Sequence, residues 1–126
     1  MAQAAADGRF SRRDRLRSRR DFERLTREGE RRSAGALIVF FGRGPRRGRD
    51  EAGPRPRLGV TASRKVGGSV VRSAVKRRIR AAFRAHRELL PPGSDVVVIA
   101  RPAAAALAGR ELAETLAGLF RGEARR

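Results

Sequence analysis

The sequence contains no cysteine, no tryptophan and no tyrosine, and it has one histidine among its 126 residues. Without cysteine, neither a disulfide framework nor a thiolate metal site can form. The single histidine, His86, falls on the apolar side of a helical wheel, with no nucleophile or carboxylate at a spacing typical of catalysis. We therefore interpret His86 as a residue at the edge of the core, and we expect no catalytic residue in this chain.

Long hydrophobic runs are also missing. The longest, residues 36–41 and 96–100, have the length of β-strands, whereas a membrane-spanning helix needs about 20 apolar residues. The N-terminus lacks the apolar core of a signal peptide. We therefore expect a cytoplasmic protein that has no membrane partner.

Acidic residues are scarce as well. The chain has 13 Asp and Glu against 31 Lys and Arg, a formal net charge of +18, and no acid lies between Ala52 and Arg87. Such a charge attracts polyanions, and arginine forms planar, bidentate contacts with phosphates. A protein that cleaves phosphodiesters with its own metal ions needs carboxylates beside the substrate. We expect a nucleic-acid-binding protein with no metal site of its own and no small-molecule substrate.

The basic residues gather on the segment 69–84, which the spacing predicts to be a helix. One side of this helix is apolar and consists of Val71, Val75, Ile79, Ala82 and Phe83, continued by Leu89 and Leu90. The opposite side carries Arg72, Lys76 and Arg80 at positions i, i+4 and i+8. Like charges at this spacing repel, whereas an ordinary solvated face mixes both signs. The row therefore indicates a helix that faces a nucleic acid.

The rest of the chain alternates between helix and strand patterns. A first helix starts after Ser18, the predicted N-cap, and ends at Gly29, which offers a left-handed stop. Runs at 36–41, 57–63 and 95–100 predict strands, with a loop at 42–56, and leucines and Phe120 predict a last helix at 112–120.

These elements predict one domain of the α/β class, an α+β sandwich in which helices cover one side of a small mixed sheet. We expect a single RNA-binding domain at 11–121. A disordered extension at 1–10 and a basic tail at 122–126 flank it.

Aromatic rings are few, and three of them are candidates for stacking on single-stranded bases. Phe40 and Phe41 are neighbours in a predicted strand, so they point to opposite faces of the sheet, and we favour one exposed ring. Phe22, in the first helix, fits a core role and a binding role equally well. Gly67 and Gly68 either admit a phosphate at the N-terminus of the central helix or make the turn.

Several motifs follow one another along the chain. The run 57–67 reads RLGVTASRKVG, and it leads to VVRSAVKRRIR at 70–80 and to Phe83-Arg84. Asp21-Phe22 and Gly29 precede these runs, and DVVVIARP at 95–102 follows them. In this order and spacing the motifs resemble the protein component of bacterial ribonuclease P, over most of the chain from residue 16 to 120.

The resemblance implies that the strand–helix–strand unit at 57–100 crosses over left-handedly. It implies an accessory subunit that binds the catalytic RNA and the 5′ leader of precursor tRNA and promotes endonucleolytic 5′-end maturation. The chemistry then belongs to the RNA and to the Mg²⁺ that this RNA holds. The residues implied for contact with the RNA subunit are Arg64, Lys65, Arg72, Ser73, Lys76, Arg77, Arg80 and Arg84. Those implied for a cleft that grips the leader are Arg15, Phe22 and Phe40.

The chain departs from the family pattern at three positions. Ser73 and Ala74 stand where the family has Asn and Arg, and Thr26 stands where the first helix usually carries a second aromatic residue. One alternative is a structural RNA-binding protein of ribosomal type, with no role in cleavage. Such a protein would bind precursor and mature tRNA equally. A nuclease that acts alone is the other alternative, and it would need carboxylates at its site.

Overall fold

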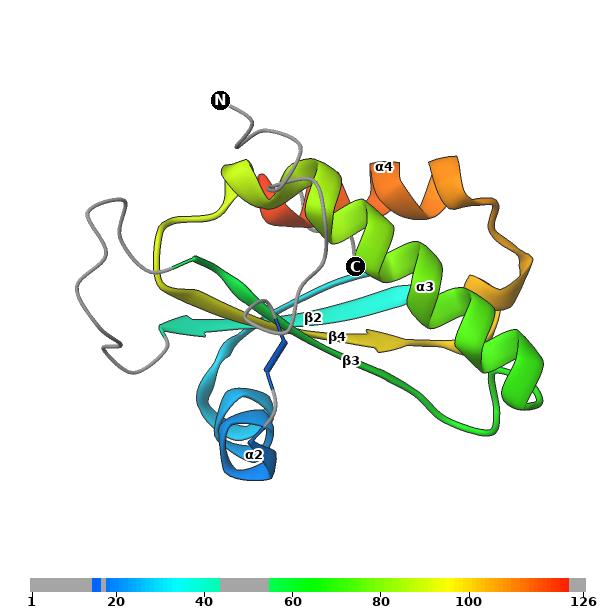
Figure 1. Cartoon of the computed structure of the whole chain (residues 1–126), viewed down its shortest axis with the longest axis horizontal. Helices are drawn as coiled ribbons and strands as arrows, with labels where there is room; N and C mark the ends of the chain where they lie inside the picture. The colour runs from blue at the N-terminus through cyan, green and yellow to red at the C-terminus, as the bar shows by residue number, and fades with distance from the viewer. Residues whose placement is uncertain (1–14, 17, 44–54, 123–126) are drawn as a thin grey trace.

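The computed structural model describes residues 15–16, 18–43 and 55–122. The predicted extension at 1–10, most of the predicted loop and residues 123–126 of the predicted tail lie outside the described residues. The described elements are α2 (Arg19–Glu28), β1 (Glu30–Ala34), β2 (Leu37–Arg43), β3 (Arg57–Ala62), α3 (Ser69–His86), β4 (Ser94–Ala100) and α4 (Gly109–Phe120) (Figure 1). Short 3-10 helices at Arg87–Leu89 and Pro102–Ala106 flank β4.

The strands form one mixed sheet in the order β1-β2-β4-β3. The β1–β2 and β2–β4 pairs are antiparallel, whereas β3 and β4 are parallel and are connected through α3. In Figure 1, β3 crosses in front of β4 and α3 lies above both strands, so this connection is left-handed. The predicted mixed sheet and the crossover that the resemblance implies are thus confirmed, against the strong right-handed preference of such units.

Helices lie on both faces of the sheet, so the prediction that they cover one side is wrong. The helices α3 and α4 cover one face, and α2 packs against the other (Figure 1). The reason is visible in β4, where Val96 and Val98 face α3 and α4 while Val97 faces α2. A run of consecutive apolar residues is typical of a strand that is buried on both faces.

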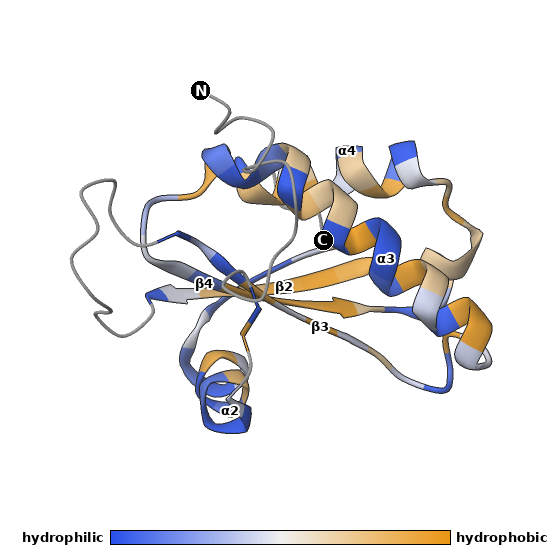
Figure 2. Ribbon diagram, in the orientation of Figure 1, coloured by the Kyte–Doolittle hydropathy of each residue, from blue (hydrophilic) through white to orange (hydrophobic). Residues whose placement is uncertain are grey.

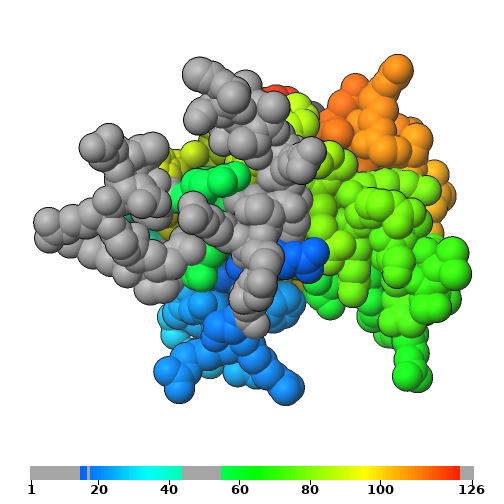
Figure 3. All heavy atoms as spheres, viewed as in Figure 1, coloured from blue at the N-terminus to red at the C-terminus, as the bar shows by residue number. Residues whose placement is uncertain are grey.

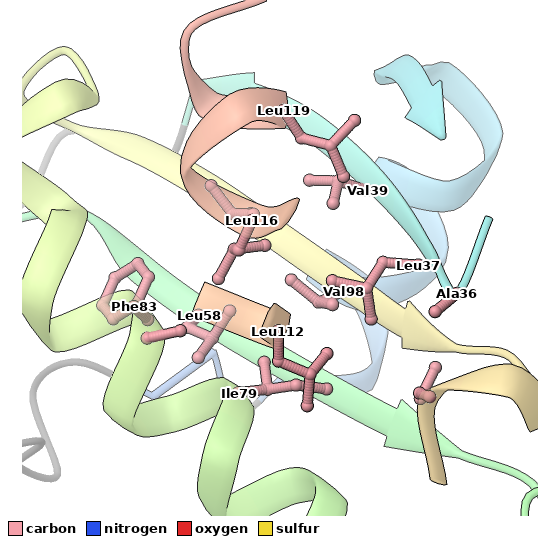
Figure 4. Packing of buried hydrophobic residues seen from close by; sticks show 14 of the residues in the cluster. Ala36, Leu37, Val39, Leu58, Ile79, Phe83, Val98, Leu112, Leu116 and Leu119 are labelled. Atoms are coloured by element: carbon pink, nitrogen blue, oxygen red, sulfur yellow. The ribbon is translucent and has the colours of Figure 1, made fainter. Parts of the chain in front are cut away.

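The larger core lies between the sheet and the helices α3 and α4. Leu112, Leu116 and Leu119 of α4 point toward the strands, and Ile79 and Phe83 of α3 lie close to β3 (Figure 4). Figure 2 shows the same division by hydropathy: β2 and β4 are largely hydrophobic, whereas the outer surface of α2 is hydrophilic. Packing of these apolar side chains, which are removed from water, provides the main stabilisation of the domain.

The central helix follows its predicted pattern except at the two ends of the apolar side. Val75, Ile79, Ala82 and Phe83 are buried, but Val71 is 39% exposed and Leu89 is 36% exposed. Val71 lies in the first turn of α3 and packs over Gly67 of the preceding turn instead of over the sheet. Leu89 follows the end of the α-helix, in a 3-10 turn where the helical period no longer applies.

The first helix begins as predicted but ends differently. The Ser18 side chain accepts a hydrogen bond from the Asp21 N–H, so the predicted N-cap is confirmed. Gly29 has an extended backbone, with φ of −74° and ψ of 162°, so the predicted left-handed stop is wrong. Glycine is needed there for space, because a Cβ atom would lie 2.6 Å from the Leu25 carbonyl oxygen and 2.7 Å from that of Phe41.

Replacing Gly29 by alanine is therefore expected to lower the free energy of unfolding by about 1–3 kcal/mol, measured by chemical denaturation. Gly109→Ala is the matched control, because a Cβ atom at Gly109 meets nothing within 4 Å. The control is expected to be neutral or slightly stabilising. If Gly29→Ala is as stable as the unsubstituted protein, α2 does not approach β2 as closely as described.

The strand β1 has no apolar run, and the sequence pattern does not predict it. As an edge strand it needs none, and Arg32 anchors it instead. The Arg32 guanidinium lies 4.4 Å from the centroid of the Phe41 ring, and its Nη1 donates to the Leu119 carbonyl at 2.7 Å. That carbonyl belongs to the last turn of α4, where a cation is favourable. Arg32 thus ties β1 to both β2 and α4.

Candidate RNA interface

Arg72, Lys76 and Arg80, which we call the basic row, lie along one flank of α3, between its buried face and the exposed positions Ser73, Arg77 and Ala81. The prediction that this row lies opposite the apolar side is therefore wrong. All three side chains are partly exposed, and α3 contains no acidic residue. Ser73 and Arg77 lie exposed beside the row, and Arg84 continues it by one turn. The structure therefore brings together, on one helix, all the predicted contacts to the RNA subunit except Arg64 and Lys65. A row of cations on a helix that carries no acid is suited to binding phosphates.

Not every cation of α3 belongs to this surface. The Nη1 of Arg78 donates to the carbonyl of Leu107, at 3.4 Å, in the segment that leads to α4. Arg78 is therefore directed toward the protein itself, on a different side of the helix from the basic row. Its neighbour Arg77 is exposed. The helical period thus separates a structural arginine from the arginines available to a ligand.

Arg64 and Lys65 lie in the exposed turn that leads from β3 into α3. Gly67 has a φ of 156°, and a Cβ atom there would lie 2.8 Å from Val71 Cγ1, so this glycine serves the turn. Gly68 is the N-cap of α3 and supplies no side-chain cap. A Cβ atom at Gly68 would meet nothing within 4 Å. The first turn of α3 is therefore open, next to two cations.

Arg15, which lies outside α3, adds a further positive charge near the basic row. Burial lowers the pKa of Arg80, and the positive charge of Arg15 lowers this pKa further. A nearby like charge disfavours the charged form of Arg80. Figure 3 shows the first described residues, in dark blue, directly against α3, in green. A bound phosphate would relieve the repulsion between Arg15 and Arg80.

On the other face of the sheet, apolar side chains form what we call the α2-side cluster. Leu16, Leu25 and Val97 are its buried members, and Phe22, Phe40 and Ile99 are partly exposed. Phe22 lies above Gly59, where a Cβ atom would be 3.5 Å from its ring. Phe41 points to the opposite face, where its ring packs edge-on against that of Phe120, with 6.0 Å between the ring centroids. The predicted division of Phe40 and Phe41 between the two faces is confirmed.

The structure separates Arg15 from Phe22 and Phe40, with which the resemblance groups it. Its backbone pairs with Leu58 as an isolated bridge along the outer edge of β3, and the Leu16 N–H donates to the Leu58 carbonyl at 2.9 Å. Leu16 points into the α2-side cluster. Successive side chains of extended backbone point in opposite directions, so Arg15 points to the α3 side. The structure thus joins Phe22 with Phe40, and Arg15 with Arg80.

Comparisons with known proteins show the family and the fold of this chain. A family model described as ribonuclease P matches residues 10–122. The ribonuclease P protein component of Streptomyces griseus is 42% identical over 118 residues, which covers 89% of this chain and 96% of that protein. The chain belongs to the ribonuclease P protein family. The solved ribonuclease P protein of Thermotoga maritima has a TM-score of 0.72 and 29% identity, and the match covers 86% of this chain and 96% of that one.

In this member of the family, an ion-pair network that the sequence pattern did not predict attaches α2 to the sheet. Asp95 of β4 is fully buried. Arg57 of β3 donates to both of its carboxylate oxygens, at 2.9 and 2.7 Å. Arg24 of α2 lies 3.5 Å from Asp95 and 3.3 Å from Asp21. Asp21 in turn lies 3.5 Å from Arg57.

The network also keeps Arg57 charged. Its hydrogen bond to Asp95 is the largest cause that raises the pKa of Arg57, and the negative charges of Asp95 and Asp21 add to the effect, while burial opposes it. The pair Arg57 and Asp95 sits at aligned register positions of β3 and β4. An aspartate at the start of an apolar strand, with an arginine at the start of its parallel neighbour, is the sequence signal that would have revealed it.

The described residues contain no group of three or more His, Asp or Glu side chains that could hold a metal ion. The ion-pair network offers two carboxylates, and two arginines already occupy them. Within the same part of the chain, no helix is long and apolar enough to cross a membrane.

Proposed function

We propose that this protein, as a protein subunit of ribonuclease P, binds the RNA subunit through the basic row and the 5′ leader of precursor tRNA through the α2-side cluster. The observation that supports the proposal is that the two faces of the sheet carry different kinds of side chain. One face bears a helix with cations and no acids, and the other bears partly exposed rings. The proposed setting is the cytoplasm.

The basic row is proposed to face the RNA subunit because it is regular and lies on a rigid element. Phosphates along one RNA strand are regularly spaced, and a helix presents cations at i, i+4 and i+8 along one line. Arg64, Lys65, Arg77 and Arg84 extend this surface at both ends and along its side. Such contacts position a protein on RNA without reading its sequence.

The α2-side cluster is proposed to hold the leader because single-stranded bases stack on aromatic rings. Phe22 and Phe40 come from different elements, and both are partly exposed. Base–aromatic stacking of this kind contributes about 1–3 kcal/mol per base and tolerates any sequence. Precursor tRNAs with different leaders could therefore be bound by the same surface.

Bond cleavage is proposed to belong to the RNA subunit and to the Mg²⁺ that this RNA holds. The described residues contain no cluster of three or more His, Asp or Glu side chains that could hold a metal ion. A metal-dependent nuclease needs such ligands for its metal ions. The role of this chain is to neutralise phosphates and to hold the substrate. Nothing in the comparisons supports the alternative of a structural RNA-binding protein without a role in cleavage.

The experiment that tests leader binding compares two ligands. The dissociation constants of precursor tRNA and mature tRNA are measured for the RNA subunit alone and for the reconstituted holoenzyme. The holoenzyme is expected to prefer the precursor by about tenfold or more, because one or two stacked leader bases supply that difference. Equal affinity for the two tRNAs in the holoenzyme would contradict the proposal and favour a structural role.

A further inference from the structure

The side of the sheet that faces α2 carries three rows of side chains, set by the register of β2, β4 and β3. Across the sheet, the first row is Gly42, Asp95 and Arg57, the second is Phe40, Val97 and Gly59, and the third is Ile38, Ile99 and Thr61. The helix α2 lies over the first two rows. A Cβ atom at Gly42 would meet Leu25 of α2 at 2.5 Å, and one at Gly59 would meet Phe22 at 3.5 Å.

The first row holds α2 through charge. Asp95, at its centre, is buried without exposure to solvent and receives two hydrogen bonds from Arg57. Arg24, on α2, reaches the same carboxylate at 3.5 Å and also donates to the Arg43 carbonyl at 3.2 Å. A buried carboxylate needs such partners, because an unpaired charge in the interior is strongly unfavourable.

The second row lies under the ring of Phe22, and the residue before Phe22 belongs to the same ion-pair network. Asp21 precedes Phe22 directly, and its carboxylate lies 3.3 Å from Arg24 and 3.5 Å from Arg57. The same two arginines therefore bind Asp95 below and Asp21 above. Because Asp21 and Phe22 are adjacent, these ion pairs lie one residue from the ring that packs over Gly59, in the cluster that also includes Phe40.

We propose that Asp95 is a positioning residue for leader binding: through Arg57 and Arg24 it holds Asp21, and thereby Phe22, at the place where a leader base stacks. The inference rests on the proposed function of the α2-side cluster. Asp95 has no exposed surface, so it acts on the substrate through other residues.

The charges of the network argue against a simpler role for its arginines. Two carboxylates and two guanidinium groups cancel, so Arg24 and Arg57 are engaged by the protein at this end of the cluster. If these arginines instead served as phosphate contacts, removal of the Asp95 charge would free them and strengthen binding of any tRNA. If Asp95 positions Phe22, the same change weakens binding of the precursor alone.

The test is a double-mutant cycle in the reconstituted holoenzyme. The ratio of the dissociation constants of mature and precursor tRNA is measured for the unsubstituted protein, Asp95→Asn, Phe22→Ala and the double variant. Phe22→Ala is expected to reduce the ratio about tenfold. Asp95→Asn is expected to reduce it several-fold, and to reduce it no further when Phe22 is already alanine. Affinity for the RNA subunit is expected to stay within about twofold, because the basic row lies on the other side of the sheet.

Two further variants separate positioning from a general loss of stability. Asp21→Asn breaks the more exposed end of the network and is expected to act as Asp95→Asn does, which keeps the test valid if Asp95→Asn folds poorly. Leu116→Ala removes a buried side chain of α4 on the opposite face and is expected to reduce stability but not the ratio.

The outcomes are distinct. The inference is overturned if Phe22→Ala reduces the ratio while Asp95→Asn and Asp21→Asn leave it unchanged, or if the effects of Asp95→Asn and Phe22→Ala simply multiply. An equal fall of the ratio in Leu116→Ala also overturns it. If Phe22→Ala itself leaves the ratio unchanged, then the proposed function of the α2-side cluster fails, and the inference fails with it.

Discussion

The triple variant Arg72→Ala, Lys76→Ala and Arg80→Ala is expected to reduce the salt dependence of binding to the RNA subunit. The slope of log affinity against log salt concentration should fall in magnitude by about 2 to 3, because each lost phosphate contact removes roughly 0.7 to 0.9 from it. Affinity at low salt should fall most. Titration of labelled RNA subunit with protein at several salt concentrations measures both quantities.

A matched control removes the same charge elsewhere. Arg19, Arg27 and Arg110 are exposed and lie outside α3, and their replacement by alanine lowers the net charge by the same three units. This control should lose far less of the slope, because long-range attraction is screened over about 10 Å at ordinary ionic strength. Equal effects of the two triple variants would show that net charge alone governs binding and that the basic row does not contact phosphates.

Asp95→Ala is expected to lower the free energy of unfolding by about 3–5 kcal/mol, because it leaves the partly buried Arg57 guanidinium without its main partner. For a domain of this size the melting temperature should fall by roughly 10–20 °C. The side chain of Arg57 is 12% exposed, so solvent compensates only in part. Thermal and chemical denaturation of the free protein measure the loss.

The double variant Arg57→Met and Asp95→Val is the control for this prediction. Replacing both partners by apolar side chains removes the pair without leaving a buried charge, and such exchanges are often close to neutral. The double variant should therefore be more stable than Asp95→Ala. If Asp95→Ala is as stable as the unsubstituted protein, the buried carboxylate does not contribute to the stability of the domain.

The central helix and its basic row could be predicted from the sequence because both obey one local period. Val75, Ile79 and Phe83 recur at helical spacing, and the same spacing places Arg72, Lys76 and Arg80 together. The period fails where the helix stops contacting the sheet, at Val71 and Leu89. The limits of an apolar stripe depend on which neighbours lie opposite, and these neighbours are distant in the sequence.

The position of α2 could not be predicted for the same reason. Its own residues predict a helix but not which face of the sheet it covers. That choice depends on Gly42 and Gly59, which leave room for Leu25 and Phe22, and on Asp95, which lies 71 residues from Arg24. Strand β1 was missed because its stabilising contacts, through Arg32, are also made with distant residues.

We propose that this protein neutralises and clamps RNA and contributes no reactive group. The most direct measurement is cleavage of precursor tRNA at low Mg²⁺ by the RNA subunit alone, by the protein alone and by the two together. If the proposal is right, the RNA alone cleaves slowly, the protein alone does not cleave, and the reconstituted complex shows restored cleavage. Cleavage by the protein alone, or failure of the protein to restore cleavage by the RNA, would contradict it.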